Sequence, residues 1–324
     1  MSGTHRHWAS IGESTFVGGI VFLCAVERWL GRWPFRVCVY PVVFCHWLFN
    51  GTARRASLQY LRRLQDAQGV FDRRPGLRHS LRHLAMFAET MLDKFLAAGG
   101  RYPAGRVRMQ REVMLEQIAS GQGGVIVTAH IGCLELCQAL ADDVPGFRLT
   151  ALVHTAHAED FNRLLRRINP GSRVELLQVT QLDAAMAIRL GERVARGEFI
   201  AIAGDRVPVS GARSVEASFL GAPAPFPIGP YVLASAIGCP LFAMACTHEG
   251  VGYRVRFERF CDRVQLPRGR RDAALAEQAQ RFSHWLEQQV RDAPYDWFNF
   301  FPFWDQPGWS PSPHSTSHTD RSMA

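Results

Sequence analysis

A histidine and a glutamate, His130 and Glu135, follow an apolar run in the sequence Gly124-Val125-Ile126-Val127-Thr128-Ala129-His130-Ile131-Gly132-Cys133-Leu134-Glu135. Residues 125–127 predict a buried strand and residues 134–140 a helix. His130 then lies at the carboxyl end of a strand, where open α/β sheets build their sites. A carboxylate that orients an imidazole makes it a general base. The spacing therefore predicts that His130, paired with Glu135, deprotonates a hydroxyl group.

Two other interpretations of this motif remain open. A histidine with a nearby glutamate is also common as a surface or capping pair. Cys133 and Cys137 make a zinc site with His130 a second alternative, because thiolates and imidazoles are the usual ligands of zinc. The position between a strand and a helix favours the general base over both.

A second apolar run ends in the same manner, in Ile200-Ala201-Ile202-Ala203-Gly204-Asp205-Arg206. It predicts a strand that delivers a glycine, a carboxylate and a guanidinium group at its carboxyl end. Arg206 is suited to bind a phosphate or to stabilise a developing oxyanion. We expect Asp205 and Arg206 to bind substrate, and the alternative is a structural ion pair between them.

A loop rich in glycine and proline, residues 218–230, follows this second strand and leads into a predicted helix over residues 231–237. Backbone amides at the start of a helix attract an anion or a polarised carbonyl group. We therefore expect Gly221 and Gly229 to contribute to substrate binding.

The elements that position these residues alternate between strand and helix from about residue 112. Predicted strands cover residues 125–127, 147–154, 174–177, 199–203, 241–247 and 253–257, and predicted helices cover residues 111–120, 160–168, 182–195, 231–237 and 272–291. Such alternation predicts an α/β fold with a mostly parallel central sheet flanked by helices. Before it, residues 52–98 predict helices, and residues 306–324, rich in serine, proline and histidine, predict a disordered tail.

The N-terminal region contains short apolar stretches, residues 16–26 and 37–49, the second interrupted by Pro41 and His46. Neither reaches the roughly 18 to 20 apolar residues that a membrane-spanning helix requires. Tryptophans and arginines crowd the same region, as in helices that lie in a membrane interface. We expect membrane-associating helices here, and the alternative is that they pack on the main domain.

Composition narrows the possible classes of protein. The chain has 324 residues, 47% of them hydrophobic, and a net charge of +8 carried almost wholly by arginine. This charge suggests an anionic partner. No helix-turn-helix, stacked aromatic motif or zinc knuckle supports nucleic-acid binding, and no G-x-S-x-G motif supports a serine hydrolase. The eight cysteines include no C-x-x-C pair, which favours free thiols in a reducing, cytoplasmic setting.

Taken together, the motifs resemble those of the bacterial lipid A biosynthesis (lauroyl/myristoyl) acyltransferases, in the wider lysophospholipid acyltransferase superfamily. The similarity covers roughly residues 10–305. The matching segments are His130 with Glu135, Gly204-Asp205-Arg206, residues 219–224 with Gly229-Pro230, and the aromatic segment Tyr295-Asp296-Trp297-Phe298-Asn299-Phe300. On this resemblance we expect a membrane-interfacial helical region over residues 1–110 and an acyltransferase domain over residues 111–305.

The resemblance implies transfer of an acyl chain from a thioester to a hydroxyl group of a glycolipid or another envelope lipid. His130 would be the base, Glu135 its charge partner, and Arg206 an aid to substrate or transition-state binding, with no metal and no cofactor. Acyl carrier protein is the expected donor, since its acidic surface suits arginine-rich helices, and coenzyme A is the alternative. The expected location is the cytoplasmic face of the inner membrane, monotopic or single-pass. The alternative function is a non-catalytic lipid-binding protein that keeps the fold.

Overall fold

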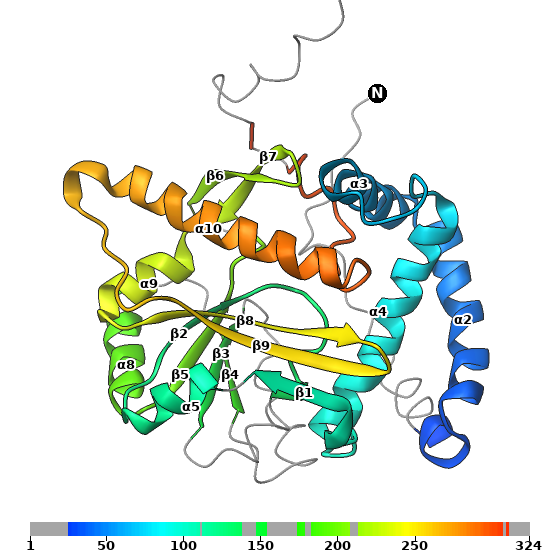
Figure 1. Ribbon diagram of the computed structural model, residues 1–324, viewed down its shortest axis with the longest axis horizontal. Coiled ribbons are helices and arrows are strands. Elements are labelled where there is room, and N and C mark those ends of the chain that lie inside the picture. Colours follow the sequence, from blue (N-terminus) through cyan, green and yellow to red (C-terminus); the bar gives the residue numbers. More distant parts are fainter. Residues whose placement is uncertain are drawn as a thin grey trace, which may run out of the picture.

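A seven-stranded sheet forms the centre of the protein (Figure 1). The computed structural model describes residues 25–110, 112–137, 147–153, 174–178, 183–207, 213–306 and 309–310. The strand order is β1-β9-β8-β2-β5-β3-β4. The strands are β1 (Val107–Gln110), β2 (Gly124–Thr128), β3 (Leu149–Val153), β4 (Val174–Gln178), β5 (Phe199–Ala203), β8 (Leu241–Glu249) and β9 (Gly252–Cys261).

Neighbouring strands of this sheet are parallel, except for the antiparallel pair β8 and β9. The predicted α/β fold with a mostly parallel sheet is therefore confirmed. β2 is buried along its whole length, as expected of a β-branched strand that is covered on both faces. β1 was not predicted, because its four residues alternate between half-buried and exposed positions at the sheet edge and include polar side chains.

Helices cover both faces of the sheet, and the sheet separates two hydrophobic cores. The first core joins one face to helices α3 (Gly51–Gln68), α8 (Ala184–Ala195), α9 (Gly229–Ile237) and α10 (Arg271–Asp292). The second core joins the other face to α2 (Arg32–Phe49), α4 (Leu77–Ala98) and α5 (Glu112–Ala119). Short 3-10 turns, η2 (Ala104–Arg106) and η3 (Arg268–Arg270), precede β1 and α10. In Figure 1, α10 crosses over the sheet and α4 lies beside α2.

The predicted loop over residues 218–230 is largely a β-hairpin, so that prediction was wrong. β6 (Ser214–Phe219) and β7 (Ala222–Pro227) form a separate two-stranded sheet. Prolines occupy alternate positions of β7, which obscured the strand in the sequence. In an antiparallel pair only every second residue directs its N–H group at the partner strand, so prolines at the other positions cost no ladder hydrogen bond.

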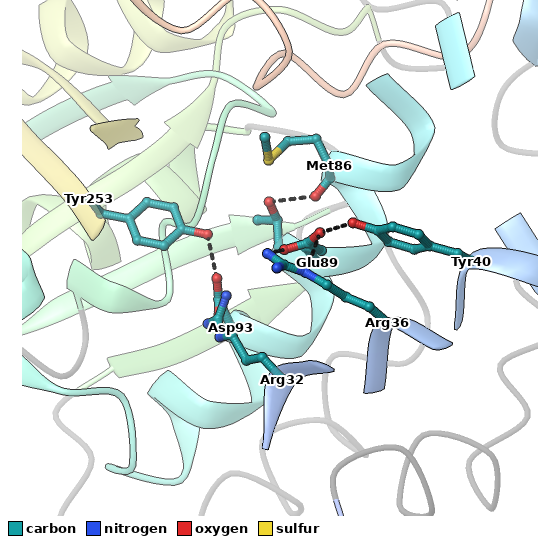
Figure 2. Close-up of polar contacts among 8 residues, drawn as sticks. Arg32, Arg36, Tyr40, Met86, Glu89, Asp93 and Tyr253 are labelled. Atoms are coloured by element: carbon teal, nitrogen blue, oxygen red, sulfur yellow. Dashed lines mark hydrogen bonds and ion pairs between the residues drawn. The ribbon is translucent and has the colours of Figure 1, made fainter. Parts of the chain in front are cut away.

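Charged and polar contacts fasten α2 to α4 (Figure 2). Arg32 forms an ion pair with Asp93, and Tyr253 from β9 donates to the other oxygen of Asp93 at 2.9 Å. Arg36 pairs with Glu89 at 2.7 Å, and Tyr40 donates to the same carboxylate. Asp93 is only 1% exposed. A buried carboxylate is costly unless it is paired, and Arg32 supplies the opposite charge. These contacts hold one face of α2 against the domain.

The opposite face of α2 is apolar and exposed. Trp33 is 74% exposed and Phe49 is 83% exposed, and Val37, Phe44 and Leu48 are exposed along the same helix. α2 runs without interruption through Pro41, although this residue interrupts the apolar character of the stretch. In the part of the chain that the structure describes, no helix has the length and hydropathy to cross a membrane. Three predicted segments lie wholly or mostly outside the described residues. They are the apolar stretch over residues 16–26, the helix over residues 160–168 and the C-terminal tail.

Candidate active site

His130 and Asp205 follow two neighbouring parallel strands. β2 and β5 pair in register along their whole length, and the amide of Gly204 donates to the carbonyl oxygen of Thr128 at 2.8 Å. A Cβ atom at position 204 would lie 2.5 Å from Cγ2 of Val127, which is too close for any side chain. Glycine at this position therefore allows the end of β5 to pack against β2. The carboxylate of the next residue, Asp205, reaches His130.

Asp205 accepts three hydrogen bonds in a nearly solvent-free position. The donors are the His130 amide at 2.9 Å, His130 Nδ1 at 2.8 Å and the indole Nε1 of Trp297 at 3.0 Å. Burial alone would raise the pKa of Asp205, but the charge and hydrogen bonds of His130, together with Arg206, outweigh burial and hold this pKa at about 2. Asp205 is therefore ionised at neutral pH and acts only as an acceptor.

This acceptor fixes the protonation state of the imidazole. Since Asp205 cannot donate, Nδ1 of His130 carries the hydrogen of their shared bond, and Nε2 of the neutral ring keeps its lone pair. Desolvation lowers the pKa of His130, Arg206 and Lys94 lower it further, and Asp205 opposes them. The side chain remains 40% exposed. The result is a neutral imidazole whose free nitrogen is accessible to a hydroxyl group.

Glu135 does not make the hydrogen bond to His130 that we expected. Its carboxylate forms an ion pair with Nζ of Lys94, from α4, at 3.1 Å, and accepts a weak contact from the Cys133 thiol at 3.9 Å. The carboxylate bound to the His130 ring is that of Asp205. A turn covers Leu134 and Glu135 before the helix begins, which directs Glu135 toward α4.

Arg206 lies in the same site and is held by the C-terminal segment. Its guanidinium group donates to the carbonyl oxygen of Phe298 at 3.1 Å and lies 5.5 Å from the ring centre of Phe301. Its charge contributes to the pKa shifts of both His130 and Asp205. Arg206 is thus placed to act on a bound substrate, and the substrate-binding roles expected of Asp205 and Arg206 stay predictions.

Gly221 lies in a turn that the sequence interpretation did not foresee, whereas Gly229 lies at the start of the helix, as expected. Leu220 and Gly221, with φ of 50° and 76°, form the two-residue turn between β6 and β7, a type of turn that needs positive φ at both positions. Gly229 is the first residue of α9. Within the described residues, no hydrogen bond or ion pair links either glycine to His130, and their substrate-binding roles stay predictions.

The segment Asp296-Trp297-Phe298 packs along the His130 loop. The Gly132 amide donates to the Asp296 carbonyl oxygen, and the Phe298 amide donates to the His130 carbonyl oxygen, each at 2.9 Å. A side chain at position 132 would place Cβ 1.8 Å from the carbonyl oxygen of Cys246, so glycine permits this packing. The C-terminal segment thereby fixes the backbone that carries the imidazole.

A buried histidine on α4, His83, forms a hydrogen bond with the same C-terminal segment. His83 is fully buried between the hydroxyl group of Ser57, at 3.0 Å, and the carbonyl oxygen of Trp297, at 2.9 Å. Burial lowers the pKa of His83 to about 4. The neutral ring then donates to Trp297 through Nε2 and accepts from Ser57 through Nδ1. His83 is therefore a packed structural residue.

Lys94, Trp297 and a second histidine-aspartate pair, His248 with Asp296, were not assigned to the site from the sequence. His248 follows a buried apolar run just as His130 does, which was a usable signal. For Lys94 the signal was its rarity, since it is the one lysine in the chain. Trp297 lies in the aromatic segment that matches the family, but nothing local shows that its indole group reaches Asp205.

The alternative of a zinc site receives no support from the arrangement of side chains. In the portion of the chain that is described, no three or more histidine, cysteine, aspartate or glutamate side chains are grouped so as to hold a metal ion. Cys133 and Cys137 are buried free thiols of the second core. Burial raises the pKa of Cys133 well above its ordinary value.

Fold and site define an α/β protein with an aspartate-oriented histidine at the carboxyl edge of a mostly parallel sheet. The family model for bacterial lipid A biosynthesis acyltransferases matches residues 81–306. The chain belongs to this family, which confirms the resemblance seen in its motifs, and it is therefore an acyltransferase that acts on lipids. None of the curated protein sequences compared with the chain gave a match.

Proposed function

We propose that the protein transfers a fatty acyl chain from a thioester to a hydroxyl group of a glycolipid or another envelope lipid. The observation that carries this proposal is the hydrogen bond of 2.8 Å between His130 Nδ1 and Asp205, which leaves Nε2 as an accessible base. Among the described residues, no serine, threonine or cysteine side chain is hydrogen-bonded to His130, and this arrangement suits direct attack by the acceptor hydroxyl group, with no covalent acyl-enzyme.

In this reaction His130 Nε2 takes the proton of the acceptor hydroxyl group as its oxygen attacks the thioester carbonyl carbon. Asp205 stabilises the imidazolium ion that forms, because it stays ionised beside Nδ1. Collapse of the tetrahedral intermediate breaks the C–S bond, and His130 returns the proton to the departing thiolate. The products are an ester and a free thiol.

We propose acyl carrier protein as the donor, with coenzyme A as the alternative. Support comes from exposed arginines on α3, in the α3–α4 connection and at the start of α4: Arg55, Arg62, Arg73, Arg74, Arg78 and Arg82. Acidic side chains are fewer there, with Asp66 and Asp72 exposed. A basic surface attracts an acidic carrier and speeds their encounter.

We also propose that α2 lies in the interface of the cytoplasmic face of the inner membrane. Its inner face is fastened to α4, and its outer face presents aromatic and aliphatic side chains to the surroundings. Insertion of such a face below the lipid headgroups removes this apolar surface from water. A lipid acceptor would then meet the enzyme without leaving the membrane.

Membrane association can be measured by co-sedimentation with vesicles of phosphatidylethanolamine and phosphatidylglycerol. The double variant Trp33→Ser/Phe49→Ser should bind at least about tenfold more weakly, since burial of each aromatic side chain contributes about 1.5–3 kcal/mol. The matched control Ile188→Ser/Val251→Ser removes two exposed apolar residues elsewhere and should bind like the wild type. Equal binding by all three proteins would contradict the role of α2.

The catalytic proposal is tested by lipid mass spectrometry on a strain that lacks the gene. A lipid should lose one acyl chain in this strain and regain it with the wild-type gene but not with His130→Ala. This result would identify the acceptor as well as the reaction. If no lipid changes, or if His130→Ala restores the lipid fully, the alternative of a non-catalytic lipid-binding protein takes its place.

A further inference from the structure

Lys94 is chemically unique in this chain. Lysine and arginine together number 37, and Lys94 is the one lysine among them. Every other side chain of permanent positive charge is a guanidinium group, which is planar and rigid, whereas an ammonium group is compact and directs its three hydrogens freely. The chain uses arginine at every other such position. The one lysine therefore indicates a role for which an ammonium group is better suited than a guanidinium group.

Lys94 contacts the segment that follows His130. It projects from α4 and forms the 3.1 Å ion pair with Glu135, five residues after His130, while 27% of its side chain stays exposed. Its charge acts on His130, and the charge of Arg206 acts on Lys94 itself. Glu135 takes one of its three N–H groups, and among the described residues no other hydrogen bond to Nζ is found. The remaining N–H groups are available to a substrate.

Acyl transfer needs a group that stabilises the carbonyl oxygen when negative charge forms on it. Backbone amides often serve, but those nearest the imidazole are already committed. The amides of residues 130 to 133 donate, in order, to Asp205 Oδ2 and to the carbonyl oxygens of Ala129, Asp296 and Cys246. Arg206 is turned to the Phe298 carbonyl oxygen and the Phe301 ring. Among the residues that the structure describes, Lys94 is the remaining cation of this cluster.

We propose that Lys94 is a catalytic residue whose ammonium group binds the carbonyl oxygen of the acyl thioester and stabilises the oxyanion. This inference rests on acyl transfer from a thioester, as proposed above. When the acceptor oxygen attacks, the C–O bond forms, the carbonyl electron pair moves to the oxygen beside Nζ, and the hydroxyl proton moves to His130 Nε2. When the intermediate collapses, the C–S bond breaks and the thiolate takes that proton.

Glu135 then acts through Lys94. The carboxylate fixes the position of the ammonium group and keeps it protonated, since burial lowers the pKa of Lys94 but Glu135 outweighs burial and raises it. The His-x4-Glu spacing therefore brings together a base, His130, and the residue that positions the oxyanion-binding cation. Glu135 is a positioning residue and Lys94 the group that touches substrate.

The kinetic experiment compares Lys94→Met, Lys94→Arg and a control, Arg268→Met, with the wild type. Arg268 is exposed in the turn before α10, so its loss removes one positive charge away from the site. With acyl carrier protein that carries a long acyl chain as the donor, kcat should fall about 10²–10³-fold in Lys94→Met, as for removal of one oxyanion donor. Lys94→Arg should lose less, and the control should match the wild type.

Two kinetic outcomes would overturn the proposal: an unchanged kcat in Lys94→Met, or a change confined to the KM of the donor. Inactivity of the wild type with every acyl thioester would instead refute the proposed function, and the two failures are therefore distinguishable.

A second measurement uses the unmodified wild-type chain and does not depend on folding of the variants. Labelling with lysine that carries ¹³C at Cε places one label in the protein, because Lys94 is the one lysine. Two long-chain acyl-pantetheine analogues are compared: a ketone with CH₂ in place of sulfur, and a thioether with CH₂ in place of the carbonyl group. At saturation the ketone should shift the Lys94 signal and the thioether should not. Equal shifts, or none with the ketone, would overturn the proposal.

Discussion

Two histidines lie at or just beyond the carboxyl ends of the neighbouring strands β2 and β8, and each is held by a buried aspartate in the same way. The amide and Nδ1 of His130 donate to Asp205 at 2.9 and 2.8 Å, and those of His248 donate to Asp296 at 2.6 and 2.9 Å. Both carboxylates are 2% exposed. The two pairs are therefore alike in their hydrogen bonds.

Their surroundings differ. His130 lies beyond the end of β2, is 40% exposed, and has two cations, Arg206 and Lys94, close enough to affect it. His248 lies within β8, is 22% exposed, and its ring centre is 4.1 Å from that of Tyr253. A hydrogen bond that orients the imidazole is therefore not enough to make a histidine a general base. Its free nitrogen must also face a space where a substrate and a charge-stabilising group can meet.

The largest difference should appear when each histidine is replaced. His130→Ala should lower kcat about 10⁴-fold, near the upper limit for loss of a general base, whereas His248→Ala should change kcat by less than about tenfold. Initial rates of ester formation from an acyl thioester measure both. Comparable losses in the two variants would show that the pairs are functionally equivalent.

Replacement of the two aspartates should distinguish the two pairs almost as strongly as replacement of the histidines. Asp205→Asn lets the amide group donate to Nδ1 and so favours the tautomer with the hydrogen on Nε2, and kcat should fall about 10³-fold. Asp296→Asn should chiefly destabilise the fold, by about 1–3 kcal/mol, because a buried charged acceptor is lost. Rates and urea unfolding curves distinguish these effects. A normal rate in Asp205→Asn would remove Asp205 from the mechanism.

His83 shows what happens to a buried histidine without a carboxylate. Its folded pKa of about 4 lies below the ordinary 6.5, so the folded protein binds fewer protons than the unfolded chain between these values. This stabilising contribution is complete above pH 6.5 and is lost as pH falls toward 4, by about 3 kcal/mol in total. The free energy of unfolding measured against pH should fall less steeply in His83→Gln, and identical slopes would contradict the shift.

Among the residues proposed to act in catalysis, the smallest loss of kcat should come from Glu135. Glu135→Gln keeps the size of the side chain but loses the charge that holds Lys94, and kcat should fall about 10- to 100-fold. This is less than for Asp205→Asn, because Asp205 contacts the imidazole directly. Steady-state rates of the two variants under the same conditions test the order. A larger loss in Glu135→Gln would restore Glu135 as the partner of His130.

The local patterns of the sequence predicted most of the elements that build the site. The apolar runs before His130 and before Gly204 were strands, and α5, α8, α9 and α10 lie where the helical periodicity indicated. The hairpin of β6 and β7 was missed, since its alternate prolines hide a strand that pairs with only one neighbour. β1 was missed because four residues at a sheet edge carry almost no periodic signal.

By itself the sequence determined which chemical groups stand at the strand ends, namely His130, Asp205 and Arg206, because local periodicity fixes which residue follows a buried strand. The tertiary structure alone decided which carboxylate meets the imidazole. Glu135 is near in sequence yet turns to Lys94, and Asp205 reaches His130 because β2 and β5 are neighbours in the sheet. Hydrogen-bond partners follow distance in space, and strand order, which no local pattern encodes, sets that distance.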